Sequence, residues 1–170
     1  MKKLVLAAAA LALAACAPPA DTGAEDAVLS IYTVTMANIG QRVTPIEDIP
    51  MSDDLRDLVT RAEAAADARD EPFIEGDIAA NCQDCTSLTN LVIGAQTGPE
   101  QIPAADGHRM VEARFTLNGN EPRSVLYDMV ETPQGWRVDN ILTEGFNLRA
   151  EAQSYLGDAE APQAESPPPP

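Results

Sequence analysis

The sequence predicts an α+β domain, with N-terminal helices packed on a curved, cone-like antiparallel meander and a short C-terminal helix after the sheet. Three observations lead to this fold class. Apolar residues recur every three or four positions in the first half of the chain, whereas in the second half they alternate with polar residues. Short turn sequences separate the alternating segments, as in consecutive hairpins. Helices followed by a run of strands are typical of a sheet that wraps around helices.

Residues 1–15 have the features of a secretory signal peptide. Two lysines precede an apolar run that ends at Ala15, and this run is shorter than the roughly 20 residues that a membrane-spanning helix needs. Leu13-Ala14-Ala15-Cys16 resembles the lipobox of bacterial lipoproteins, in which cleavage precedes an acylated cysteine. The resemblance implies that Cys16 carries lipid, and Ala17 after it implies the periplasmic face of the outer membrane. The alternative, ordinary cleavage after Ala14, leaves Cys16 as a free thiol in an oxidising compartment.

The charge of the chain bears on its partners. The net charge is −16, and removal of residues 1–15 with their two lysines takes it to −18. Such a surface repels nucleic acid and anionic lipid head groups. We therefore expect no nucleic-acid partner, and we expect contact with the bilayer only through acylated Cys16, which two or more acyl chains make durable.

Outside the signal, the sequence divides into a linker, a domain and a tail. Residues 16–23 form a lipidated N-terminus and short linker, and residues 24–157 form the predicted domain. Residues 158–170 contain five prolines among Ala, Glu and Gln, so this tail is predicted to be disordered.

Two helices are predicted in the first half. Thr22-Gly23-Ala24-Glu25 fits a capping box, and a stripe of apolar residues then runs to a stop near Gly40. Ser52-Asp53-Asp54 is a favourable start for the second helix, which Pro72 prevents from continuing. The predicted apolar faces are Leu29, Tyr32, Met36 and Ile39 in the first helix, and Leu55, Leu58, Val59, Ala62, Ala65 and Ala66 in the second.

The second half is predicted to form strands. Residues 89–96, 108–117, 124–131 and 136–142 have strand patterns, with Asn118-Gly119-Asn120 and Pro133-Gln134-Gly135 as turns. Asn147 is then placed to cap a last helix, and Gly157 is placed to end it.

Short motifs resemble a known fold. The segment from Gly135 to Ile141, which contains Trp136, resembles the closing strand of nuclear-transport-factor-2-like (cystatin-like cone) domains. Asp70-Glu71-Pro72-Phe73 and Gln83-Asp84 resemble a bacterial envelope domain of unknown function that is expected to have this fold. The resemblance spans residues 25–156, but Cys85 stands where that family has an aromatic residue. The family brings no established activity, so the resemblance implies a fold rather than a function.

Cys82-Gln83-Asp84-Cys85 has three interpretations. With Cys16 lipidated, Cys82 and Cys85 remain in a disulfide-permissive compartment, which favours a structural disulfide. A redox site needs a stabilised thiolate, typically at a helix N-terminus, and no clear helix is predicted after Cys85. A closed zinc site needs four ligands, and His108 is the only other soft ligand.

The remaining candidates are one histidine and two aromatic residues. His108, the sole histidine, would be a general base if Asp106 or Asp84 oriented it, although an exposed and inert histidine is the simpler reading. Tyr127 and Trp136 lie on adjacent predicted strands, where they line a pocket or fill the core.

These observations favour a membrane-tethered periplasmic binding or assembly module without catalysis, which recognises another envelope protein or a small ligand. No nucleophile elbow, phosphate-binding loop or HExxH motif is present, so the sequence predicts no catalytic residue, metal or cofactor. The alternative is an enzyme, either a pocket enzyme that uses His108 with a carboxylate or a thiol oxidoreductase that uses Cys82 and Cys85.

Overall fold

The α+β fold predicted from the sequence is confirmed by a computed structural model, which describes residues 23–97 and 101–160. The expectations for the signal peptide, Cys16, Thr22 and the tail beyond Glu160 lie outside these residues. The helices are α1 (Gly23–Asn38), the 3₁₀ turn η1 (Ile46–Asp48), α2 (Asp53–Asp67) and α3 (Leu148–Glu160). The strands are β1 (Leu88–Ala95), β2 (His108–Leu117), β3 (Glu121–Thr132), β4 (Gly135–Thr143) and β5 (Phe146–Asn147).

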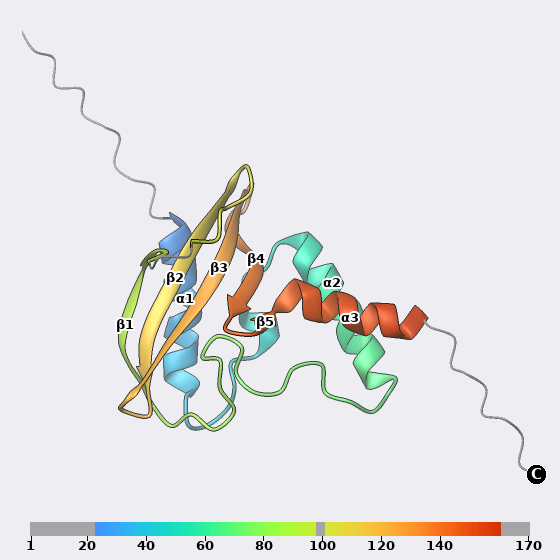
Figure 1. Cartoon of the computed structure of the whole chain (residues 1–170), viewed down its shortest axis with the longest axis horizontal. Coiled ribbons are helices and arrows are strands. Elements are labelled where there is room, and N and C mark those ends of the chain that lie inside the picture. Colours follow the sequence, from blue (N-terminus) through green and yellow to red (C-terminus); the bar gives the residue numbers. More distant parts are fainter. Residues whose placement is uncertain (1–22, 98–100, 161–170) are drawn as a thin grey trace, which may run out of the picture.

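The strands form one antiparallel sheet in which each strand pairs with the next along the chain. Helix α1 packs against the sheet through β1, β2 and β4, whereas α2 and α3 pack on one another and on β4 (Figure 1). The segment before α2 extends the sheet, because Met51 pairs with Val138 in parallel. This pairing fixes the N-terminus of α2 beside β4, where the candidate site lies.

Helix α1 forms as predicted, but its predicted buried face is only half correct: Tyr32 is buried and Ile39, just after the helix, packs against the core. Leu29 is 49% exposed and Met36 is 47% exposed, while Val28, Ile31 and Thr35 are fully buried. Tyr32 is part of the predicted face and of the observed one, and it is buried as predicted. Apolar residues occur on several sides of this helix, so their spacing alone does not fix its rotation. The buried residues of this helix are Ala24, Val28, Ile31, Tyr32 and Thr35.

Helix α2 confirms its predicted start. The Ser52 hydroxyl oxygen accepts a hydrogen bond from the Leu55 amide at 3.1 Å. Its predicted apolar residues are buried, except that Ala65 is only partly buried. The carboxylates of Asp53 and Asp54 lie in the first turn, where the helix dipole favours them.

Helix α3 begins as predicted but ends later. Asn147 Oδ1 accepts a hydrogen bond from the Ala150 amide at 3.1 Å. Gly157 was expected to end the helix, yet α3 continues to Glu160. A glycine costs a helix about 1 kcal/mol relative to alanine, which weakens the helix without forcing it to end.

The core lies between α1 and the sheet. Tyr32 and Tyr127 meet edge to face there, with ring centroids 6.2 Å apart. The Tyr32 hydroxyl donates to the Ala79 carbonyl at 2.8 Å, and the Tyr127 hydroxyl donates to that of Tyr32 at 3.3 Å. These bonds tie the loop before β1 to the helix and the sheet. In the described part of the chain, no helix has the length and apolar character needed to span a membrane.

Candidate functional site

A β-bulge in β4 organises the candidate site. Asp128 of β3 pairs with Asn140, but the next residue, Met129, pairs with Val138. Asp139 is therefore the extra residue, and the alternation of side chains breaks at this point. Val138 and Ile141 are both fully buried in the core, so Asp139 and Asn140 both lie on the opposite face of the sheet.

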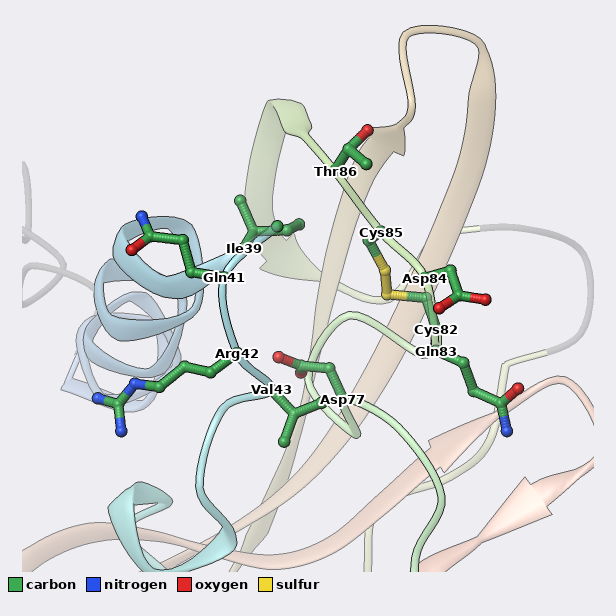
Figure 2. A pocket seen from close by; sticks show the side chains of 11 residues that line it. Ile39, Gln41, Arg42, Val43, Asp77, Cys82, Gln83, Asp84, Cys85 and Thr86 are labelled. Atoms are coloured by element: carbon green, nitrogen blue, oxygen red, sulfur yellow. A yellow bond between two sulfur atoms is a disulfide. The ribbon is translucent and has the colours of Figure 1, made fainter.

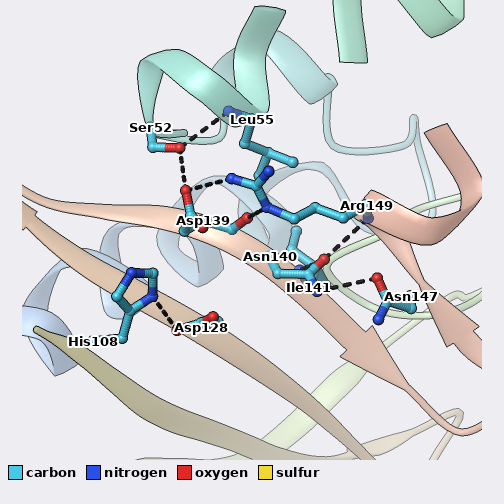
Figure 3. Close-up of polar contacts among 9 residues, drawn as sticks. All are labelled: Ser52, Leu55, His108, Asp128, Asp139, Asn140, Ile141, Asn147 and Arg149. Atoms are coloured by element: carbon cyan, nitrogen blue, oxygen red, sulfur yellow. Dashed lines mark hydrogen bonds and ion pairs between the residues drawn. The ribbon is translucent and has the colours of Figure 1, made fainter. Parts of the chain in front are cut away.

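Asp139 lies beside a pair formed by His108 and Asp128. His108 Nδ1 lies 2.8 Å from Asp128 Oδ1, and both side chains are about four-fifths buried, with 20% and 22% of their surface exposed. The two residues are diagonal neighbours on β2 and β3, because His108 pairs with Val130. One donor atom from each of His108, Asp128 and Asp139 lies within 4.8 Å of the other two. Three adjacent strands thus present one nitrogen and two carboxylates at one place (Figure 3).

Asp139 also joins the two neighbouring helices to β4. Its Oδ1 atom accepts one hydrogen bond from the Ser52 hydroxyl and one from the Arg149 guanidinium, each at 2.6 Å. Arg149 Nε donates to the Asp139 carbonyl at 2.6 Å, and the Arg149 amide donates to Asn140 Oδ1 at 3.1 Å (Figure 3). The hydrogen bonds from Ser52 and Arg149 hold the Asp139 carboxylate in one orientation, as expected where a site must be preorganised.

A groove of about 860 Å³ opens beside these residues. One side is the start of α2 with the segment before it, and the other is the hairpin between β3 and β4. His108 and Asp139 line the groove together with charged side chains of both signs. The charged residues on the two sides of the groove are Asp53, Asp54, Arg56 and Arg137.

His108 lies in this groove, but its carboxylate partner differs from the prediction. The expected partners were Asp106 and Asp84, whereas the structure pairs His108 with Asp128. Asp106 lies in the exposed loop before β2, and Asp84 lies near the far end of that strand. A ten-residue strand is about 33 Å long, so Asp84 and His108 do not share a site.

The two aromatic candidates lie on the α1 face of the sheet, away from the groove. Tyr127 is fully buried, and burial raises its pKa well above the ordinary value. Burial also raises the pKa of Tyr32, with a further contribution from Tyr127 beside it. Trp136 is partly buried and stacks with Arg109, whose guanidinium carbon lies 5.2 Å from the centroid of the ring system.

Cys82 and Cys85 are joined by a disulfide, in agreement with the favoured interpretation of the sequence. The bond lies in the loop between α2 and β1 and borders a separate hollow of about 320 Å³, which Asp84 and Arg42 also line (Figure 2). The chain after Cys85 enters β1 rather than a helix. Neither sulfur therefore lies at a helix N-terminus, the setting that stabilises a reactive thiolate.

Sequence reasoning missed Asp128, Asp139 and Arg149 as site residues. The only signal for Asp139 was the spacing of Val138 and Ile141, which are three residues apart where a regular strand has two. That spacing indicates a bulge and directs attention to the polar residues between the two apolar ones.

Comparison with known proteins leaves the family open. No protein-family model matches the chain, and no curated protein matches it. A solved structure of a phospholipid-binding protein from Ralstonia solanacearum, in complex with a phospholipid, is similar to this chain with 16% sequence identity and a TM-score of 0.44. The match covers 79% of this chain and 86% of that one. A similarity of this degree assigns no ligand to the present chain.

Proposed function

We propose that this protein is a binding module of the bacterial cell envelope, tethered to a membrane by acylated Cys16, and that its groove binds a small polar ligand. The observation that carries the proposal is the groove between α2 and the β3–β4 hairpin. A concave site in which a few polar groups converge is typical of small-molecule binding. The lipobox resemblance supports the tether, and with so short a linker after an acylated Cys16 we expect the domain to stay close to its membrane.

The charges around the groove indicate the class of ligand. Asp53 and Asp54 lie on one side with Arg56, and Arg137 lies on the other. Opposite charges that face the same space suit a molecule that carries an amino group and a carboxylate. We therefore infer that the ligand is zwitterionic, of the size of an amino acid or a short peptide.

A thermal-shift screen of amino acids, dipeptides and neutral sugars tests this proposal on the full chain. At least one zwitterion should raise the melting temperature of the wild type. The combined substitution Asp54→Asn and Arg137→Gln should remove that rise, because it removes one charge of each sign. The combined substitution Asp57→Asn and Arg61→Gln is the matched control, since it also removes one charge of each sign, from a pair on the exposed side of α2.

Two outcomes would contradict the proposed ligand class. One is that no zwitterion shifts the melting temperature. The other is that the shift survives the combined substitution, which would place the ligand elsewhere on the molecule.

The His108–Asp128 pair favours a second candidate function, proton transfer in the same groove. A carboxylate that holds Nδ1 of an imidazole leaves Nε2 able to accept a proton from a bound molecule. The substitution His108→Gln separates the two functions. If the protein only binds its ligand, the ligand stays unchanged with both the wild type and the variant. If the protein is an enzyme, the wild type converts the ligand and the variant does not. Mass spectrometry of the ligand after incubation in D₂O distinguishes these results, because removal and return of a carbon-bound proton replaces it with deuterium.

A further inference from the structure

We propose that His108, Asp128 and Asp139 bind a divalent first-row transition metal ion, with Zn²⁺ preferred to Mn²⁺ and Mg²⁺. The inference rests on the proposed function only in placing the ion where the groove's ligand would bind. The metal site itself depends on the three strands that supply its ligands.

The geometry supports the site because the three donors already converge. A donor atom of each residue lies within 4.8 Å of the other two. Ligands that share a zinc ion at about 2.0–2.2 Å are roughly 3.5 Å apart, so the donors need to approach by about 1 Å. Rotation of the His108 and Asp128 side chains supplies this approach, while Ser52 and Arg149 hold Asp139 in place. The three donors lie on adjacent strands of one hydrogen-bonded sheet, which fixes the backbone positions from which the side chains approach the ion.

The hydrogen bonds around the carboxylates leave free atoms for an ion. Ser52 and Arg149 both bind Oδ1 of Asp139, and His108 lies against Oδ1 of Asp128. Among the residues that the structure describes, none donates a hydrogen bond to Oδ2 of either aspartate. Carboxylates that bind metals are commonly held in this way by a second set of hydrogen bonds. The 2.8 Å contact between His108 Nδ1 and Asp128 Oδ1 opens to admit the ion, because a ring that keeps this contact turns Nε2 away from Asp128.

The donor types indicate the metal. One imidazole with two carboxylates is a mixed nitrogen and oxygen set, which suits zinc and its neighbours better than magnesium, an ion that prefers oxygen ligands alone. The two carboxylates offset the charge of the ion, while Arg149 behind Asp139 limits its affinity. Only three protein ligands are supplied, so a further position faces the groove, where water or the carboxylate of a zwitterion completes the coordination.

The test titrates the full chain carrying Cys16→Ser, purified without a histidine tag and stripped of metal by a chelator. His108 is the only histidine in the sequence, so long-range ¹H–¹⁵N correlation spectra report one imidazole ring. Zn²⁺ should shift the two ring nitrogens of His108 and saturate at one ion per chain. Calorimetry of the same titration should give weaker binding for Mn²⁺ and none for Mg²⁺.

Variants locate the ion. Asp128→Asn and His108→Gln should each weaken Zn²⁺ binding about ten-fold or more. Asp84→Asn should leave it unchanged, because Asp84 is exposed and lies near the other end of β2. Urea unfolding of each variant in the absence of metal checks that the fold is intact. If one of the two variants does not fold, the other still tests the site.

The metal proposal is overturned if Zn²⁺ leaves the His108 ring signals unmoved, or if binding at one ion per chain persists in both Asp128→Asn and His108→Gln. Failure of the metal proposal can be distinguished from failure of the proposed ligand class. The zwitterion screen uses Asp54 and Arg137, which are not metal ligands, and it can be repeated with chelator present.

Discussion

At the residue scale, the bulge in β4 fixes the direction of Asn140, whose Oδ1 atom accepts a hydrogen bond from the Arg149 amide beside the site. In a regular strand Asp139, which follows the inward-facing Val138, would still lie on the face opposite the core, but Asn140 would point into the core. The sequence identified His108 as a candidate because histidine is rare and chemically distinctive. It did not identify Asp128 or Asp139, because an aspartate on a strand is informative only when its register with the neighbouring strands is known.

The buried tyrosine pair predicts how stability responds to high pH. Burial raises the pKa values of Tyr32 and Tyr127 in the folded protein above the ordinary value of 10.0. Above that pH, the unfolded chain loses phenolic protons that the folded chain keeps. The free energy of unfolding should therefore be unaffected by this pair below about pH 10 and fall as the pH rises beyond it.

Urea unfolding at about pH 8 and about pH 11 measures the effect. Tyr127→Phe should reduce the loss of stability between the two values, because one of the two buried phenols is gone. Tyr155→Phe, on α3 and outside the pair, should behave as the wild type. Equal losses in Tyr127→Phe and in the wild type would show that the buried pair does not cause the alkaline instability.

At the scale of elements, the start of α2 links helix stability to the site. Ser52 accepts a hydrogen bond from the Leu55 amide and donates one to Asp139, and its own amide donates to the Val138 carbonyl. The sequence predicted the cap from Ser52-Asp53-Asp54 alone. It could not predict that the same hydroxyl contacts β4, since that contact joins segments 87 residues apart.

Replacement of the cap tests this link. Ser52→Ala should lower the free energy of unfolding by about 1–2 kcal/mol, because both the Leu55 amide and Asp139 lose a partner. Chemical denaturation measures the change, with Ser154→Ala on the exposed side of α3 as the control. A loss no greater than that of the control would mean that the hydroxyl contributes nothing to the junction of α2 and β4.

Other elements show where local patterns are sufficient and where they are not. For β2 the strand pattern was sufficient: Val111, Ala113, Phe115 and Leu117 occupy every second position, and all four are buried. For α1 the pattern was ambiguous, because apolar residues on several sides allow more than one rotation of the helix. Packing against the sheet selects one of these rotations, and the local sequence of α1 carries no information about the sheet.

At the scale of the whole molecule, the order of elements was sufficient to predict the fold class. Helices, then hairpin-connected strands, then one more helix can pack as α1 on the sheet with α2 and α3 beside β4 (Figure 1). The groove was not predictable in this way. It forms where a helix start, a hairpin and a bulge meet, and each of these is positioned by tertiary contacts.

The proposed tether is also a property of the whole molecule. A cleaved chain with a net charge of −18 is repelled by anionic head groups, so only lipid on Cys16 would hold it at a membrane. Cys16→Ser should move the protein from the membrane fraction to the soluble periplasmic fraction. The double substitution Cys82→Ser and Cys85→Ser should leave it in the membrane fraction, and continued membrane association of Cys16→Ser would contradict the tether.

The central claim is that the groove beside the β4 bulge is the binding site, and photo-crosslinking in intact cells tests it most directly. A photoreactive amino acid at Gln134, an exposed residue that lines the groove, should give a covalent adduct with the bound small molecule, seen as a defined increase in mass. The same amino acid at Gln153, exposed on α3, should give none. Absence of an adduct at Gln134, or the same adduct at both positions, would contradict the claim.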